Sequence, residues 1–95
     1  GNPDLGIGAR MMEANNWDEA IAALERAVNQ GGRKSRGRAA HNLAVVYEIL
    51  GDLEKAREWT SVAWGQYREK KSREYGYVLT NRMHEQQILD DQLKE

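Results

Sequence analysis

Apolar residues recur along the chain with the 3.6-residue period of an amphipathic helix, in five segments separated by short polar stretches. In the second segment, for example, Ile21, Leu24 and Val28 fall on one side of a helical wheel. Runs that alternate apolar and polar residues are missing, as are the Asn-Gly and Asp-Gly turns of β-hairpins. We therefore predict an all-α fold, with helices over about residues 3–14, 16–30, 35–50, 52–68 and 72–93.

Residues that favour helix ends stand at these boundaries. Asn2 precedes Pro3, an order typical of helix N-termini because proline lacks the N–H that the first turn leaves unpaired. Asn16 is followed three residues later by Glu19, as in a capping box. The other predicted N-caps are Ser35, Asp52 and Ser72, and the predicted stops are Gly31-Gly32 and Gly51.

The segment GDLEKAREWT at residues 51–60 repeats the pattern of NNWDEAIAAL at residues 15–24. Placing Ala56 on Ala20 gives an offset of 36 residues, 56 minus 20, and two helix–turn–helix units over about residues 3–31 and 36–68. Neither pair of helices can bury its apolar face alone, so we expect the units to stack. Chains with repeats of this length usually bind other molecules rather than catalyse reactions.

The two units resemble the tetratricopeptide repeat, over about residues 3–68. The residues that carry the resemblance are Ile7, Gly8, Met11, Asn15, Trp17, Ala20, Leu24 and Ala27 in the first unit, and Leu43, Ala44, Tyr47, Gly51, Leu53, Ala56 and Ala63 in the second. Small residues such as Gly8 and Ala20 would let paired helices approach closely, where longer side chains would push them apart. The resemblance implies a non-catalytic module that binds a peptide or protein segment on the concave face, which the first helix of each unit lines.

By that resemblance, the predicted binding residues are Met12, Arg38, His41, Asn42, Val45 and Glu48. Asn42 coincides with an asparagine that some family members use to hold a ligand backbone or carboxylate. The companion lysine and asparagine of the first unit are replaced by Leu5 and Ala9. An alternative is that the last helix lies in this groove, which would make Met12, Val45 and Ile49 part of the core.

The segment over about residues 72–94 does not repeat the pattern. We expect it to form a long helix that caps the second unit, so that residues 1–95 make one domain. Its apolar stripe, from Tyr75 through Met83 to Leu93, also suggests a second function. In this alternative the chain is a structural or assembly domain that pairs with another copy through its last helix, as a homodimer.

The string from NWDEAI through GRAAHNLAVVYEILGDLEKA to the long last helix also resembles the C-terminal part of uncharacterised cell-envelope lipoproteins from Bacteroides-type bacteria. That resemblance implies an envelope location and a part that precedes Gly1, but no activity. Without it, a cytoplasmic location is expected, and the lack of cysteine leaves the compartment undecided. No stretch approaches the roughly 20 apolar residues that cross a bilayer, so we expect no membrane insertion by this segment.

Charges nearly balance, with 14 Lys and Arg against 15 Asp and Glu, so no strong overall attraction to nucleic acid is expected. Locally, basic residues gather in the two segments that leave the units: Arg33, Lys34, Arg36 and Arg38, then Arg68, Lys70, Lys71 and Arg73. Because stacked units run in parallel, we expect one basic edge and, at the turns within the units, an opposite acidic edge.

Arg36 and Arg38 oppose the dipole at the start of a predicted helix, so we interpret them as serving an anionic partner rather than helix stability. A solvated loop is the alternative. Nucleic acid is not expected as the partner, because none of the tryptophans falls within either basic run and single-stranded nucleic acid is usually held by aromatic stacking.

Patterns of catalytic and metal-binding residues are weak. His41 and His84 fall on different predicted helices, and His84-Glu85 lacks the second His of an HExxH motif. The serines lack a GxSxG elbow, and the absence of cysteine excludes thiolate chemistry. We therefore predict no catalytic residue, no metal and no cofactor, and a protein or peptide as the partner.

Overall fold

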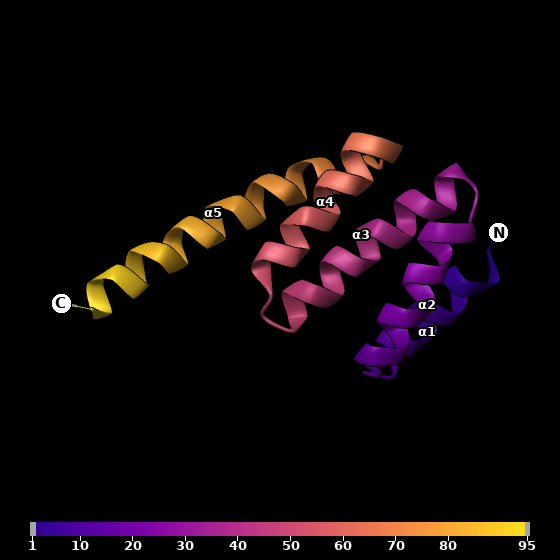
Figure 1. Ribbon diagram of the computed structural model, residues 1–95, viewed down its shortest axis with the longest axis horizontal. Coiled ribbons are helices and arrows are strands. Elements are labelled where there is room, and N and C mark those ends of the chain that lie inside the picture. The colour runs from indigo at the N-terminus through magenta and orange to yellow at the C-terminus, as the bar shows by residue number, and fades with distance from the viewer. Residues whose placement is uncertain (1, 95) are drawn as a thin grey trace.

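A computed structural model describes residues 2–94 and folds them into α-helices joined by short connections (Figure 1). The helices are α1 (Pro3–Glu13), α2 (Trp17–Gln30), α3 (Arg33–Ile49), α4 (Leu53–Tyr67) and α5 (Lys70–Leu93). Each helix packs on the next one in the chain. No strand occurs among the described residues, so the predicted all-α class is confirmed.

The turns within the two hairpins, α1–α2 and α3–α4, have the same construction 36 residues apart. Asn15 and Gly51 both adopt a left-handed backbone conformation, with φ of 60° and 85°. The same two hydrogen bonds close each turn: Asn15 N to Met12 O and Asn16 N to Met11 O in the first, Gly51 N to Glu48 O and Asp52 N to Tyr47 O in the second. This pattern is a Schellman ending, which favours glycine or asparagine at the left-handed position.

The predicted contact points of the hairpins are buried as expected. Ala20 on α2 and Ala56 on α4 have no exposed surface, and they too stand 36 residues apart. Gly8 on α1 lies so close to α2 that a Cβ built on it would be 2.5 Å from Leu24 Cδ2. One core joins both hairpins through α2 and α3: Ala20, Leu24, Ala27, Val28, Ala39, Ala40, Leu43, Val46 and Ala63.

Two of the predicted N-caps are confirmed by side-chain hydrogen bonds and two are wrong. Asn2 Oδ1 accepts from Asp4 N at 2.8 Å, and Asp52 Oδ1 accepts from Lys55 N at 3.1 Å. Asn16 stands at the N-cap of α2 without a side-chain capping bond. Ser35 and Ser72 lie inside α3 and α5, because those helices begin earlier, after Gly32 and Glu69.

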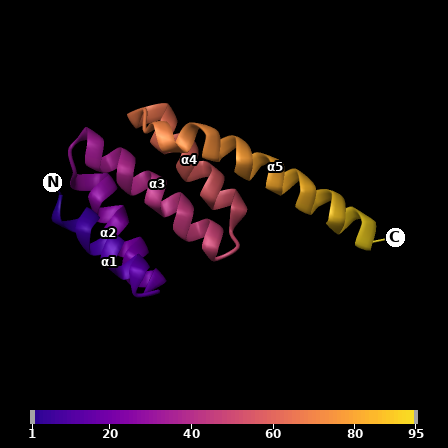
Figure 2. The same cartoon turned by 180° about the vertical axis from the view of Figure 1, so that it is seen from behind.

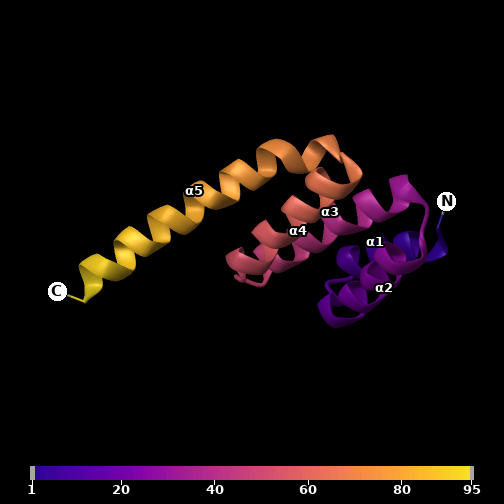
Figure 3. The same ribbon diagram turned by 45° about the horizontal axis from the view of Figure 1, so that its top comes forward.

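The long helix α5 lies against α4 over its first half and then leaves the rest of the molecule (Figures 1 and 2). Ser72 and Leu79 are buried in this contact, whereas every residue from His84 to Lys94 is exposed. In Figure 3 the second half of α5 has no other helix beside it. The projection gives the molecule its length, 50 Å against 27 and 17 Å. The predicted cap on the second unit is thus made by the first half of α5 alone.

Candidate binding surface on α3

The residues predicted to line the concave face are arranged along one side of α3, with one contribution from α1. Arg38 is exposed, and His41, Asn42, Val45 and Glu48 are half-buried. Met12, from α1, packs against the buried core, as the alternative of a filled groove expects. Ile49, which the same alternative places in the core, is 53% exposed, so that part of the alternative is wrong.

An open hollow of about 390 Å³ lies beside the first half of α3. Its lining comes from three helices and one connection: Leu5 of α1, Arg38, His41 and Asn42 of α3, Glu69 before α5, and Lys71 of α5. Two cations and an amide thus face one carboxylate and one apolar side chain. An anionic group is the ligand that this charge balance favours.

His41 connects the hollow to α5. Its Nδ1 lies 2.7 Å from the hydroxyl of Ser72, and its ring centroid lies 5.5 Å from that of Tyr75. Burial lowers the pKa of the His41 imidazole below 6.5; the nearby Glu69 carboxylate opposes this shift, and Lys71 adds to it. The imidazole is therefore neutral at pH 7, and its nitrogen forms a hydrogen bond across the α3–α5 interface.

Glu48, farther along α3, also holds α5. Its carboxylate accepts a hydrogen bond from the Tyr75 hydroxyl and forms an ion pair with Arg82. Burial raises the pKa of Tyr75, so its hydroxyl stays protonated as the donor. Two of the predicted binding residues, His41 and Glu48, therefore hold the last helix, and the open part of the predicted surface is the end near Arg38 and Asn42.

The Ser72–His41 pair offers no exposed nucleophile. Ser72 is 1% exposed, so its hydroxyl is closed to a substrate, and its partner nitrogen satisfies a buried polar group. Sequence reasoning missed this contact because it expected Ser72 at the N-cap of α5. The two residues are separated by 31 positions and no motif connects them.

The connections that carry the basic runs lie at one edge of the molecule, and the turns within the hairpins lie at the opposite edge (Figure 1). At the basic edge, Arg33 and Lys34 are exposed at the start of α3. Lys70, Lys71 and Arg73 are exposed at the start of α5. The arrangement of these segments agrees with the expected basic edge, whose anionic partner stays a prediction.

Arg36 differs from the other basic residues, because it has a structural role that the sequence interpretation denied. Its Nε donates to Gly31 O at 2.7 Å and its Nη2 donates to Asn29 O at 3.2 Å. These carbonyls belong to the C-terminal end of α2, where the last carbonyls have no partner within the helix. Arg36 thus caps the preceding helix, although its charge stands at the start of α3.

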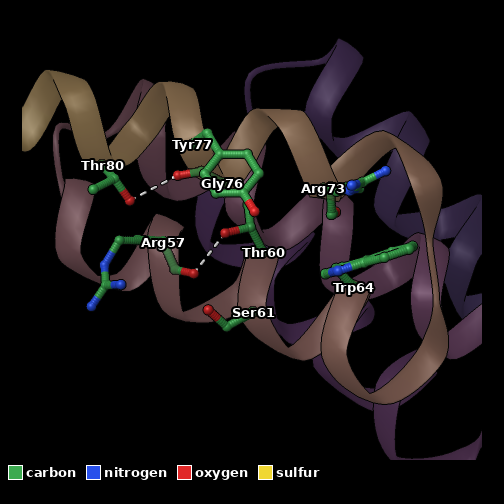
Figure 4. A pocket seen from close by; sticks show the side chains of 9 residues that line it. Arg57, Thr60, Ser61, Trp64, Arg73, Gly76, Tyr77 and Thr80 are labelled. Carbon is green, nitrogen blue, oxygen red and sulfur yellow. Dashed lines mark hydrogen bonds between the residues drawn. The ribbon is translucent and has the colours of Figure 1, made fainter.

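A second hollow, of about 190 Å³, lies between α4 and α5 (Figure 4). Its threonine hydroxyls are already used, because Thr60 donates to Arg57 O at 2.7 Å and Thr80 donates to Gly76 O at 3.0 Å. At one end the Trp64 ring lies against two guanidinium groups of the second basic run, those of Arg68 at 5.0 Å and Arg73 at 5.6 Å from its centroid. The sequence showed no tryptophan within a basic run, but the fold places one there.

Between residues 2 and 94, no three His, Asp or Glu side chains gather in a way that could hold a metal ion. His41 lies on α3 and His84 is exposed on α5, so the two imidazoles are on different helices, as predicted. Within the described part of the chain, no helix combines the length and the apolar character that a membrane span requires.

Comparison with known families gives one assignment. Over residues 6–88, the sequence matches the model of a family described as a domain of unknown function (DUF6340). No curated protein and no solved structure gives a significant match. The family match covers most of α1 and most of α5 together with the three helices between them.

Proposed function

The chain belongs to the DUF6340 family of domains of unknown function, and we propose that it is a non-catalytic module that binds an acidic protein segment in the hollow beside α3. One observation carries this proposal. The hollow collects Arg38 and Asn42, two of the predicted binding residues, with Lys71 from the basic edge. Arg38 and Asn42 lie one turn apart on α3, and Lys71, 29 residues after Asn42, is brought to them by the side-chain contacts that hold the start of α5 to α3.

The chemistry of the hollow favours a peptide-like ligand. The carboxamide of Asn42 can donate to a backbone carbonyl and accept from a backbone N–H of an extended segment. Arg38 and Lys71 supply positive charge for a carboxylate, and the guanidinium of Arg38 can bind it with two parallel hydrogen bonds. Leu5 supplies an apolar contact at the α1 side. Glu69 would repel a second acidic group, which favours one carboxylate at a defined position.

The likeness to tetratricopeptide repeats supports this proposal and belongs to it. The repeated turns and the buried Ala20 and Ala56 fit two such units, with α1 and α3 as the helices that would line a concave face. The family match does not name that repeat, so the tetratricopeptide character stays part of the proposal. The first half of α5 would then be the cap that closes one end of the groove.

The test uses two labelled peptides with free C-termini, one alternating glutamate with leucine and the other alternating lysine with leucine. Fluorescence polarisation should show binding of the acidic peptide and none of the basic one. Arg38→Glu should weaken binding by about tenfold, which corresponds to about 1.4 kcal/mol. Asn42→Ala should also weaken it, because the ligand backbone loses its amide partner.

Arg57→Glu is the matched control, since it makes the same charge change on the exposed surface of α4, outside the hollow. It should leave the affinity within about twofold of the unsubstituted chain. Equal losses in Arg38→Glu and Arg57→Glu would show a general charge effect and would contradict a site at α3.

A further inference from the structure

The exposed face of α5 carries two pairs of large apolar residues. Tyr77 and Val78 are 68% and 51% exposed, and Ile88 and Leu89 are 57% and 53% exposed. The pairs are separated by 11 residues, which is about three helical turns and about 16.5 Å along the axis. The two pairs therefore repeat along the side of the helix opposite Ser72 and Leu79. Tyr77 also borders the hollow between α4 and α5, and Leu89 borders a hollow shared with Ile49 and Leu53. Apolar pairs repeated along one side of a helix are anchors that a second helix can use.

The structure assigns that partner: we infer that α5 pairs in antiparallel orientation with α5 of a second copy of this chain, centred near Met83. In this arrangement Tyr77 and Val78 meet the partner's Ile88 and Leu89, and the reverse contacts form at the other end. A two-fold symmetric interface requires such reciprocal contacts: if one residue touches a second residue of the partner, the second touches the first of the partner. The two pairs lie nearly equidistant from Met83, five or six residues away on either side.

Charge selects a second copy in antiparallel orientation. The part of α5 before Met83 carries Lys70, Lys71, Arg73 and Arg82 against the single acid Glu74, and the part after it carries Glu85, Asp90 and Asp91 against the single cation Lys94. Antiparallel pairing places the basic first half of each α5 beside the acidic second half of the other, while Arg82 keeps its ion pair with Glu48 of its own chain. Parallel pairing would put like charges together, which destabilises helix pairs.

The fold leaves room for this partner. The side of α5 that packs on α4 carries Ser72 and Leu79, opposite the exposed pairs. A second α5 on the exposed side therefore extends the stack outward, with its own α4 farther away. The free second half of α5 in Figures 1 and 3 would gain the cover that it lacks within one chain. The pairing uses a surface separate from the hollow beside α3.

The first test is sedimentation equilibrium of the whole chain from low to several hundred micromolar. A short seam of this kind should give a reversible dimer with a dissociation constant in the micromolar range, as small transient interfaces do. Ile88→Glu should weaken the dimer at least tenfold. Leu50→Glu is the matched control, since Leu50 is 48% exposed at the end of α3 and borders the α1–α2 turn, away from α5. Unchanged circular dichroism verifies that both variants fold.

The second test determines whether the paired helices are parallel or antiparallel by disulfide cross-linking. Because the chain has no cysteine, only the introduced cysteines can form a disulfide. With the centre near Met83, residue 81 lies opposite residue 85 of the partner. An equimolar mixture of Asn81→Cys and Glu85→Cys chains should therefore form mainly the mixed disulfide under oxidation. Two homodisulfides in place of the mixed one would indicate parallel pairing and overturn the proposal. A chain that stays monomeric at every concentration would overturn it too, as would equal weakening by Ile88→Glu and Leu50→Glu.

Discussion

The substitution Gly8→Ala tests the close approach of α1 and α2, on which the first hairpin depends. A Cβ at residue 8 would lie 2.5 Å from Leu24 Cδ2 and 2.7 Å from Leu24 Cγ. Carbon atoms in contact prefer about 3.5–4.0 Å, so roughly 1 Å of movement is needed. Leu24 has no exposed surface and cannot turn into solvent, so the helices themselves must separate.

Two opposing terms set the magnitude. Replacing glycine by alanine inside a helix stabilises it by about 0.8–1 kcal/mol. Overpacking a filled core costs about 1–3 kcal/mol. We therefore expect Gly8→Ala to lower the free energy of unfolding by about 1 kcal/mol, the balance of these two terms. In a domain of this size, that loss lowers Tm by about 4–8 °C.

Gly6→Ala is the control within the same helix. Its Cβ would meet the guanidinium of Arg10 at 3.5 Å, an ordinary contact with an exposed side chain. Gly6→Ala should therefore raise the free energy of unfolding by about 0.5–1 kcal/mol, the intrinsic preference alone. Urea and thermal unfolding followed by circular dichroism at 222 nm give the two values. The same chemical change should thus act with opposite sign two residues apart.

A double-mutant cycle with Leu24→Ala then isolates the contact. Without the Leu24 side chain the obstacle is gone, so Gly8→Ala should stabilise the Leu24→Ala background by about 1 kcal/mol. The coupling between the two sites would then be about 2 kcal/mol. If Gly8→Ala stabilises the chain as much as Gly6→Ala does, α1 and α2 do not touch at Leu24, and the reasoning from small residues to hairpin packing is refuted.

Two further predictions concern side chains in the polar contacts around α3. Burial lowers the pKa of His41 in the folded chain below 6.5, so as pH falls the imidazole is protonated in the unfolded chain before it is protonated in the folded one. The stability that His41 contributes above about pH 6.5 is therefore lost as pH falls through the folded pKa. Urea titrations at about pH 7.5 and 5.5 should show a drop that His41→Gln reduces, and an equal drop in the variant would contradict this assignment. Arg36→Gln removes the cap on the α2 carbonyls and should cost about 0.5–1.5 kcal/mol. Arg38→Gln, exposed at the hollow, should change stability by less than about 0.5 kcal/mol, and equal losses in the two variants would refute the capping role.

The parts of the fold that the sequence predicts are those decided by neighbours in the chain. The left-handed turn at Gly51 depends on the backbone freedom of one residue, and the shared hydrogen-bond pattern makes Asn15 its equivalent. Burial of Ala20 and Ala56 follows from apolar periodicity together with the repeat. Such features are local, so a single sequence is enough to find them.

The contacts that position α5 are decided between residues far apart, and these were missed. Ser72 bonds to His41 across 31 positions, and Tyr75 bonds to Glu48 across 27. A serine after a polar stretch favours an N-cap, but the N-cap lies three residues earlier at Glu69, whose carboxylate accepts a hydrogen bond from Lys71 N. The apolar periodicity of two helices also does not show at which point along their lengths they cross. It therefore could not tell which half of α5 covers α4.

The point at which α5 crosses α3 and α4 affects both proposals, the peptide site beside α3 and the dimer through α5. Ser72 and Tyr75 fix the start of α5 beside α3, and this places Lys71 at the hollow with Arg38. The same contacts direct the rest of α5 away from the molecule, so that Ile88 is left exposed for a partner. Loosening the start of α5, for example by Ser72→Ala, would disturb both surfaces. Arg38→Glu and Ile88→Glu should each disturb one, which is why the peptide and dimer measurements are best made on the same set of variants.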